Sequence, residues 1–144
     1  MGVTTATGFA NFFKRSDPTI YSTLVPQNVW GLAASPSSDV FYTLGGTSGT
    51  KVLMIDISAT VMTPIIDRTG SLNEGSVMAY DTFTDSLVWT ERQPDLTYTI
   101  FAAKAAVNAA VRTVKTNLPR QYCIAVDDES VYWLNGGVPF KTAK

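Results

Sequence analysis

The sequence predicts an all-β fold, and three observations support that prediction. β-Branched and aromatic residues occur in short runs, which clusters of Gly, Pro, Ser and Asp separate. Helix signals are nearly absent, and the alanine-rich stretch 102–110 lacks helix caps. We expect its centre, 105–108, to be a turn between strands, with a short helix as the alternative. The chain has 144 residues, 45% hydrophobic and 16% charged, which suits one globular domain with a core.

A pentapeptide recurs three times along the chain. Its central alanines, Ala33, Ala79 and Ala125, are 46 residues apart each time. Each copy is followed by a short polar stretch and then by an apolar run that contains an aromatic residue. A period in the forties with an aromatic in each unit is typical of four-stranded β-propeller blades. The sequence therefore predicts three blades per chain.

The strands of each predicted blade follow from the runs between turn signals. In the unit 29–74 we expect strands over 30–34, 40–44, 51–57 and 61–67. In the unit 75–120 we expect them over 77–80, 86–91, 97–104 and 111–116. The unit 121–144 is partial, with strands over 122–126 and 131–134 and at most a short third strand. Pro64 is tolerable because its strand is the outermost of its blade.

The segment 1–28 precedes the first repeat and holds two apolar-rich runs, 8–15 and 19–25, with the character of third and fourth blade strands. Three blades are too few to close a ring, and unpaired strand edges invite association. The simplest closure is a homodimer, in which two half-propellers form a six-bladed ring and segment 1–28 completes the C-terminal blade of the partner. The alternatives are an excised or artificial part of a longer propeller, a half that pairs with a different half, and a β-sandwich.

Two of the aromatic runs carry a family resemblance. Leu87-Val88-Trp89-Thr90-Glu91 and Val131-Tyr132-Trp133-Leu134-Asn135 resemble the Tyr-Trp-Thr-Asp signature of LDL-receptor-type six-bladed propellers. The strands before them, with Ala79 and Ala125, are similar to those of NHL-repeat and TolB-like propellers. The first unit departs from the signature, with Tyr42 where we expect the Trp. The resemblance implies a scaffold that binds proteins, peptides, sugars or small molecules, and it does not imply one activity.

Residues at repeated positions have a structural interpretation. We expect Tyr42, Trp89 and Trp133 to pack between blades, although ligand stacking is the functional alternative for the tryptophans. The repeated acids Asp81 and Asp127, with Ser35 in the first unit, are expected to accept hydrogen bonds in the turn after the first strand of each blade.

The best candidate for binding is the position before each pentapeptide, near the mouth of the predicted channel. It holds Trp30, Ser76 and Tyr122, whose identities differ while the surrounding frame repeats; packing at the rim is the alternative explanation. Neighbouring loops add amide and charged groups, from Gln27, Asn28, Asn73, Glu74, Arg120 and Gln121. Such a mixed aromatic and polar pocket suits a sugar or a peptide.

Several function classes receive no support from the sequence. There is no histidine, no Gly-x-Ser-x-Gly motif and no phosphate-binding glycine loop, so we assign no catalytic residue, metal or cofactor. The net charge of −1 does not favour nucleic acid, and no apolar run is long enough to cross a membrane. Cys123 is the sole cysteine, and its apolar surroundings predict a buried, inert thiol.

We therefore expect a non-catalytic recognition or scaffold protein whose partners are a second copy of itself and a small molecule, sugar or peptide. A lectin-like sugar binder is one alternative. A calcium-dependent hydrolase or lactonase that recruits Asn73, Glu74 and Asn117 is another. An engineered or excised propeller fragment without a ligand is a third. The N-terminus lacks a signal peptide, so a cytoplasmic location is the default expectation, and a mature secreted chain would have the same features.

Overall fold

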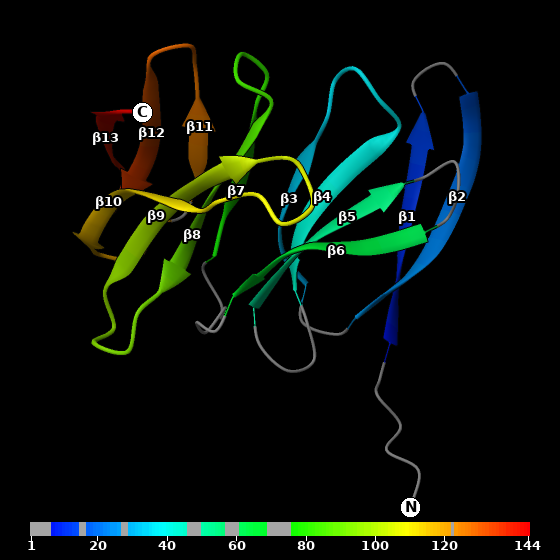
Figure 1. The fold of residues 1–144 in the computed structure, drawn as a ribbon, viewed down its shortest axis with the longest axis horizontal. Coiled ribbons are helices and arrows are strands. Elements are labelled where there is room, and N and C mark those ends of the chain that lie inside the picture. The colour runs from blue at the N-terminus through cyan, green and yellow to red at the C-terminus, as the bar shows by residue number, and fades with distance from the viewer. Residues whose placement is uncertain are drawn as a thin grey trace, which may run out of the picture.

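The computed structural model describes residues 7–14, 17–26, 29–45, 50–56, 61–68, 76–121 and 123–144. Before Trp30, and at Thr50, the description covers the backbone alone. In these residues every regular element is a β-strand, and thirteen strands form four antiparallel sheets (Figure 1). The all-β prediction is confirmed.

The sheets follow the order of the chain. An N-terminal hairpin pairs β1 (Thr7–Lys14) with β2 (Asp17–Pro26). The first full sheet consists, in spatial order, of β3 (Val29–Ala34), β4 (Val40–Gly45), β5 (Thr50–Asp56) and β6 (Val61–Arg68). The second full sheet consists of β7 (Met78–Asp81), β8 (Ser86–Arg92), β9 (Tyr98–Lys104) and β10 (Arg112–Leu118). The three-stranded sheet consists of β11 (Ile124–Val126), β12 (Ser130–Asn135) and β13 (Val138–Ala143).

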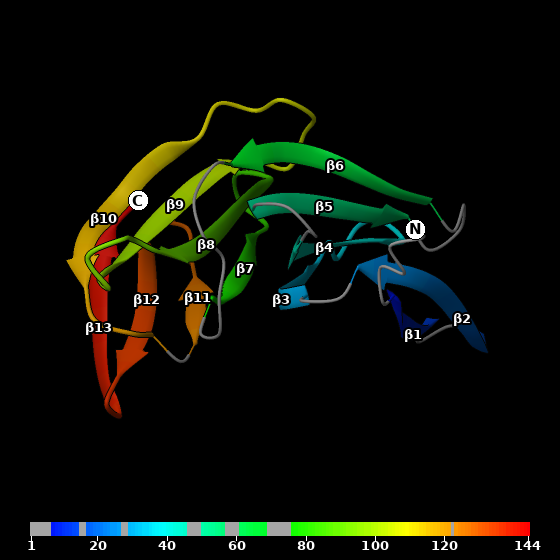
Figure 2. The ribbon, with the colours of Figure 1, turned by 90° about the horizontal axis from the view of Figure 1, so that it is seen from below.

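The three larger sheets are stacked around an arc. Figure 2 shows β3, β7 and β11 on its inner side and β6 and β10 on its outer side. The inner strands are in contact, since β7 touches both β3 and β11. Figure 1 shows all three inner strands running in the same direction. Their starting ends therefore share one rim, which we call the starting rim, and the turns that follow them share the opposite rim, the turn rim.

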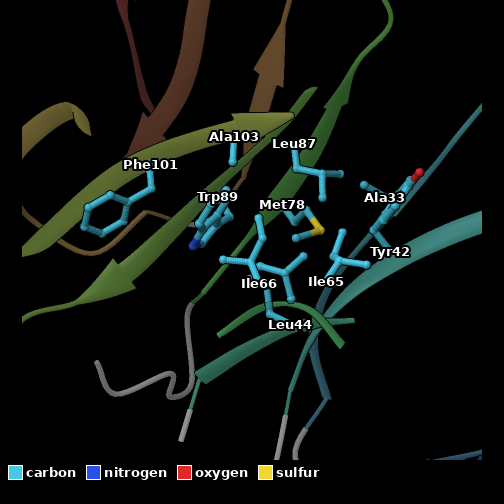
Figure 3. Close-up of a cluster of buried hydrophobic side chains, with 11 residues drawn as sticks. Ala33, Tyr42, Leu44, Ile65, Ile66, Met78, Leu87, Trp89, Phe101 and Ala103 are labelled. Atoms are coloured by element: carbon cyan, nitrogen blue, oxygen red, sulfur yellow. The ribbon is translucent and has the colours of Figure 1, made fainter. Parts of the chain in front are cut away.

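Two hydrophobic clusters fill the spaces between the sheets. The first lies between the two full sheets and includes Ala33, Tyr42, Leu44, Met78 and Trp89 (Figure 3). The second lies between the second full sheet and the three-stranded sheet and includes Val88, Ile100, Val131 and Trp133. Period-2 alternation explains this division, because Trp89 and Val88 are neighbours on β8 that point to opposite faces. The expected packing of the aromatic positions between sheets agrees with both clusters.

The pairing of the strands shows that the predicted equivalence of Tyr42 with Trp89 is wrong. Tyr42 pairs with Ala33, whereas Trp89 pairs with Met78, the residue before Ala79. The residue of β4 at the tryptophan position is therefore Thr43, not Tyr42. The 46-residue spacing itself aligns Tyr42 with Val88 and Thr43 with Trp89, so matching Tyr42 to Trp89 by its aromatic type shifts the alignment by one residue. Because one residue changes the face, Tyr42 and Trp89 meet in the same cluster from facing sheets.

Two predictions about single segments are confirmed and one, for Cys123, is wrong. Residues 105–108 form the predicted turn, and Asn108 N donates to Ile65 O of the first full sheet at 2.7 Å. Pro64 lies on the outermost strand β6, as expected. The prediction for Cys123 is wrong: it precedes β11 and is exposed, because the strand begins only at Ile124.

The third strand of the last sheet is longer than expected. Instead of a short remnant, β13 pairs with β12 over six residues, from Val138 opposite Asn135 to Ala143 opposite Ser130. Gly136 and Gly137 both have positive φ, at 56° and 83°, which is the backbone of a tight two-residue hairpin turn. The turn at Gly136 and Gly137 therefore connects β12 to a full third strand.

The described residues form no helix that is long and apolar enough to span a membrane.

Candidate functional site

The starting rim gathers the described members of the predicted binding position. Trp30 is the second residue of β3, Ser76 precedes β7 by two residues, and Gln121 precedes β11 by three. Because β7 contacts both β3 and β11, these residues belong to neighbouring inner strands. The remaining predicted members of this group lie outside the described residues; they are Gln27, Asn28, Asn73, Glu74 and Tyr122.

Two buried side chains on this rim each have a polar atom that no described residue satisfies. Ser76 is 5% exposed and Gln121 is fully buried. Within the described part of the chain, Ser76 Oγ and Gln121 Oε1 have no hydrogen-bond partner. The amide of Gln121 is half satisfied, because its Nε2 donates to Pro119 O. An unmet buried acceptor costs about 1–3 kcal/mol, so each of these atoms is a place where a donor from a ligand or a water would be stabilising.

The backbone beside Ser76 is held by two reciprocal bonds. Thr90 N donates to Val77 O, and Val77 N donates to Thr90 Oγ1, both at 3.0 Å. Thr90 is fully buried on β8. These bonds extend the pairing of β7 and β8 beyond Met78, so the hydroxyl of Ser76 is presented from a fixed backbone.

The other two described candidates differ from Ser76 and Gln121. Trp30 is half-buried, pairs with Leu44 and packs against the first hydrophobic cluster. That contact supports the packing explanation for its ring. Arg120 is exposed beside the buried Gln121.

Sequence reasoning missed a buried ionic group near this rim. Glu91, on β8, is 1% exposed, and it accepts hydrogen bonds from Arg68 Nε at 3.0 Å and Arg68 Nη2 at 3.2 Å. Trp89 Nε1 also donates to Glu91, at 2.7 Å. The guanidinium of Arg68 lies 4.2 Å from the ring centroid of Phe101. One available signal was that Trp89 and Glu91 are two apart on a strand and so share a face. Each charge is paired, so this group links the two full sheets.

The repeated acids organise the turn rim. Asp81 Oδ1 accepts from the backbone N of Phe83 at 3.0 Å, and Asp127 Oδ1 accepts from the backbone N of Glu129 and Ser130 at 2.9 and 2.7 Å. This is the turn role expected of both residues. The Ser35 hydroxyl instead lies 3.3 Å from that of Ser37.

Asp81 also forms a buried ion pair with Lys144. Lys144 Nζ lies 2.6 Å from Asp81 Oδ2, and both side chains are largely buried. Burial raises the pKa of Asp81, but the hydrogen bonds from Lys144, Thr84 and the Phe83 N–H, with the charge of Lys144, outweigh burial and lower the pKa below its usual value. The carboxylate is therefore stabilised in its charged form.

The described residues contain no group of three or more His, Cys, Asp or Glu side chains placed to hold a metal ion. Asn117, which the calcium-dependent alternative would recruit, lies on β10, the strand of the second full sheet farthest from β7. Neither the protein-family models nor the curated proteins gave a match to this chain.

Proposed function

We propose that this protein is a non-catalytic recognition scaffold. In this proposal its sheets are propeller blades of the YWTD, NHL or TolB-like kind, two copies close a six-bladed ring, and the starting rim binds a ligand. The observation that carries the binding proposal is a pair of buried polar atoms, Ser76 Oγ and Gln121 Oε1, which have no partner among the described residues and lie just before neighbouring inner strands. Both can accept hydrogen bonds, so the ligand they suit carries hydroxyl or amide N–H donors, as a sugar or a peptide does.

Self-association is supported by one face of the three-stranded sheet, whose residues are half-buried or exposed. On the three-stranded sheet, Val131 and Trp133 point toward the second full sheet, so Tyr132 and Leu134 point away from it. Ala125 and Lys141, which flank Tyr132 on the same face, are exposed. The equivalent alanine of the first full sheet, Ala33, is buried against the next sheet. The exposed face thus has the position of a blade face that awaits a neighbour.

The opposite end of the arc supports the same proposal. Alternation along β4 points Tyr42 and Leu44 toward the second full sheet and Phe41 the other way. Phe41, with Leu53 and Ile55 of β5, is nevertheless buried. Figure 2 shows the β1–β2 hairpin on that side of the first full sheet. The hairpin therefore has the position of the outer half of a further blade.

Light scattering over a dilution series tests the assembly. One chain is 15.6 kDa, so the two-copy ring has a mass of about 31 kDa, and dilution should convert it to monomer with loss of stability. A species that stays near 15.6 kDa at all concentrations would count against the ring.

Ligand screening tests the recognition site. A glycan array and a peptide library separate a lectin-like binder from a peptide binder. The double variant Ser76→Ala/Gln121→Met removes both unpartnered acceptors, and we expect it to weaken the binding of any hit at least tenfold. Arg112→Met, on the outer strand β10, is the matched control and should bind as the parent does. Equal binding by the double variant and the parent would move the site away from the starting rim.

A further inference from the structure

The last sheet already holds a strand in its third position. Trp133 pairs with Phe140 of β13, and the two rings stack with centroids 5.9 Å apart. In the second full sheet Trp89 also pairs with Phe101 of β9, and these two rings are tilted with centroids 6.1 Å apart. The strand β13 is therefore the counterpart of β9, and the position that no described strand fills is the fourth, the counterpart of β10.

The N-terminal hairpin consists of a third strand and a fourth strand. In both full sheets the fourth strand leads directly to the inner strand of the next sheet, as β6 leads to β7 and β10 leads to β11. The strand β2 leads to β3 in the same way, so it is a fourth strand and β1, its hairpin partner, is a third strand. Within the described residues β1 pairs with β2 alone, so its other edge suits a second strand such as β12.

With these assignments, β13 and the β1 strand of a second copy would compete for the same edge of β12. If the hairpin of a second copy completed the last sheet as a unit, its β1 would need the edge of β12 that β13 occupies. We infer that the seam of the ring forms by strand replacement, in which β1 and β2 of the second copy take the place of β13. This inference rests on the proposed two-copy assembly and specifies how that assembly closes.

The alternative, in which β13 stays and accepts β2 on its outer edge, is disfavoured by Pro139. In a two-residue hairpin the residues that flank the turn, Asn135 and Val138, form a hydrogen-bonded pair. The next pair, Leu134 and Pro139, then points its backbone groups outward. Proline has no N–H, so the outer edge of β13 lacks a donor where a fourth strand would need one.

The strand β13 is also poorly buried. Val138 is 54% exposed and Phe140 is 44% exposed, whereas six of the seven residues of β9 are buried. Its end is held by Lys144, whose N donates to Glu129 O at 3.1 Å and whose Nζ pairs with Asp81. A weakly packed strand with one ionic anchor is suited to exchange, and the incoming hairpin supplies two strands for the one that leaves.

A disulfide lock tests the replacement. Tyr132 and Lys141 are cross-strand partners in a non-hydrogen-bonded pair, whose Cα separation of about 4.5 Å falls in the range a disulfide spans. We would introduce Tyr132→Cys/Lys141→Cys in a Cys123→Ser background. The matched control is Lys51→Cys/Asp67→Cys in the same background, because the Lys51 and Asp67 side chains also meet across a strand pair, with Nζ 3.4 Å from Oδ1.

Light scattering of the oxidised and reduced proteins then separates the outcomes. We expect the oxidised lock to stay monomeric, and the reduced lock and both forms of the control to dimerise. An oxidised lock that dimerises as tightly as its reduced form would overturn strand replacement and leave the ring in place. A parent and control that stay monomeric at all concentrations would overturn the ring itself, and strand replacement with it.

A second variant, without the disulfide, tests whether the ion pair of Lys144 with Asp81 restrains β13. Lys144→Met removes the ion pair with Asp81, so we expect it to release β13 and tighten dimerisation by tenfold or more. Lys115→Met, at an exposed position on β10, is the control and should leave the dissociation constant unchanged. Weaker dimerisation of Lys144→Met than of the control would contradict a restraining role for β13.

Discussion

Trp89 and Glu91 are joined by a hydrogen bond inside the protein, from the indole Nε1 to the carboxylate Oε1 at 2.7 Å. Both side chains are almost fully buried, and Arg68 from the first full sheet closes the group with two bonds to the same carboxylate. The indole of Trp89 also packs in the first hydrophobic cluster. Trp89 thus contributes its ring to the contact between the two full sheets and its indole N–H to the ion pair that joins them.

Removing the arginine should be strongly destabilising. Arg68→Met leaves the carboxylate of Glu91 buried with the indole as its remaining described partner, and an uncompensated buried charge costs about 3–5 kcal/mol. The double variant Arg68→Met/Glu91→Leu removes the charge as well, so we expect it to lose less than the sum of the single variants. Urea unfolding of all three measures this coupling. Lys51→Met, which breaks a partly exposed ion pair, is the control, and its loss should stay within about 1 kcal/mol. Additive losses in the double variant would contradict a coupled pair.

Gly31 permits the close approach of β3 and β7. It has a φ of 66°, and a Cβ there would lie 3.1 Å from Met78 Cβ and 3.2 Å from Met78 N. Gly31→Ala should therefore carry both a conformational and a steric cost, about 2–4 kcal/mol in all. Gly136→Ala is the matched control, because Gly136 has a φ of 56° but open space around it, and about 1–2 kcal/mol is expected. If the two variants unfold at the same urea concentration, the contact with Met78 is not tight.

The strands were predictable from the sequence because their signals are local. Alternation, β-branched runs and turn clusters placed β8 within one residue at each end, and the constant spacing of Ala33, Ala79 and Ala125 located the inner strands. The register of the strand pairing was harder to predict from the sequence. Tyr42 is aligned with the tryptophans only by its aromatic type, whereas the 46-residue spacing puts Thr43 at the position of Trp89, and the pairing shows that Tyr42 faces the other way.

The contacts of the candidate site could not be predicted, because they join residues far apart in the chain. The pairing of Arg68 with Glu91 crosses two sheets, and Lys144 reaches Asp81 from the end of β13. Only its repeat position singles out Ser76 in the sequence, and nothing there indicates that its hydroxyl is buried with no partner in the described part of the chain.

Cys123 should react in the folded protein. It is exposed ahead of β11, so one equivalent of a thiol reagent such as Ellman's reagent should label it without denaturant. Cys123→Ser should change stability by less than about 0.5 kcal/mol, as surface substitutions do, and should abolish labelling. Labelling that requires urea would show that the thiol is covered, and in a dimer its protection on raising the protein concentration would place it at the seam.

The ion pair of Asp81 with Lys144 makes stability depend on acid pH. The pKa of Asp81 is lowered in the folded state, so the folded protein binds its proton less readily than the unfolded chain, in which an aspartate has a pKa of about 3.9. Its contribution to stability is therefore fully present above that value and is lost as pH falls through the lower folded pKa. Asp81→Asn, which cannot titrate, should lose less stability between pH 7 and pH 3 than the parent in urea unfolding. Asp95 and Asp127 also have lowered pKa values, so a smaller acid loss should remain in the variant. Equal losses in the parent and in Asp81→Asn would show that the Lys144 contact does not contribute to the stability of the folded chain.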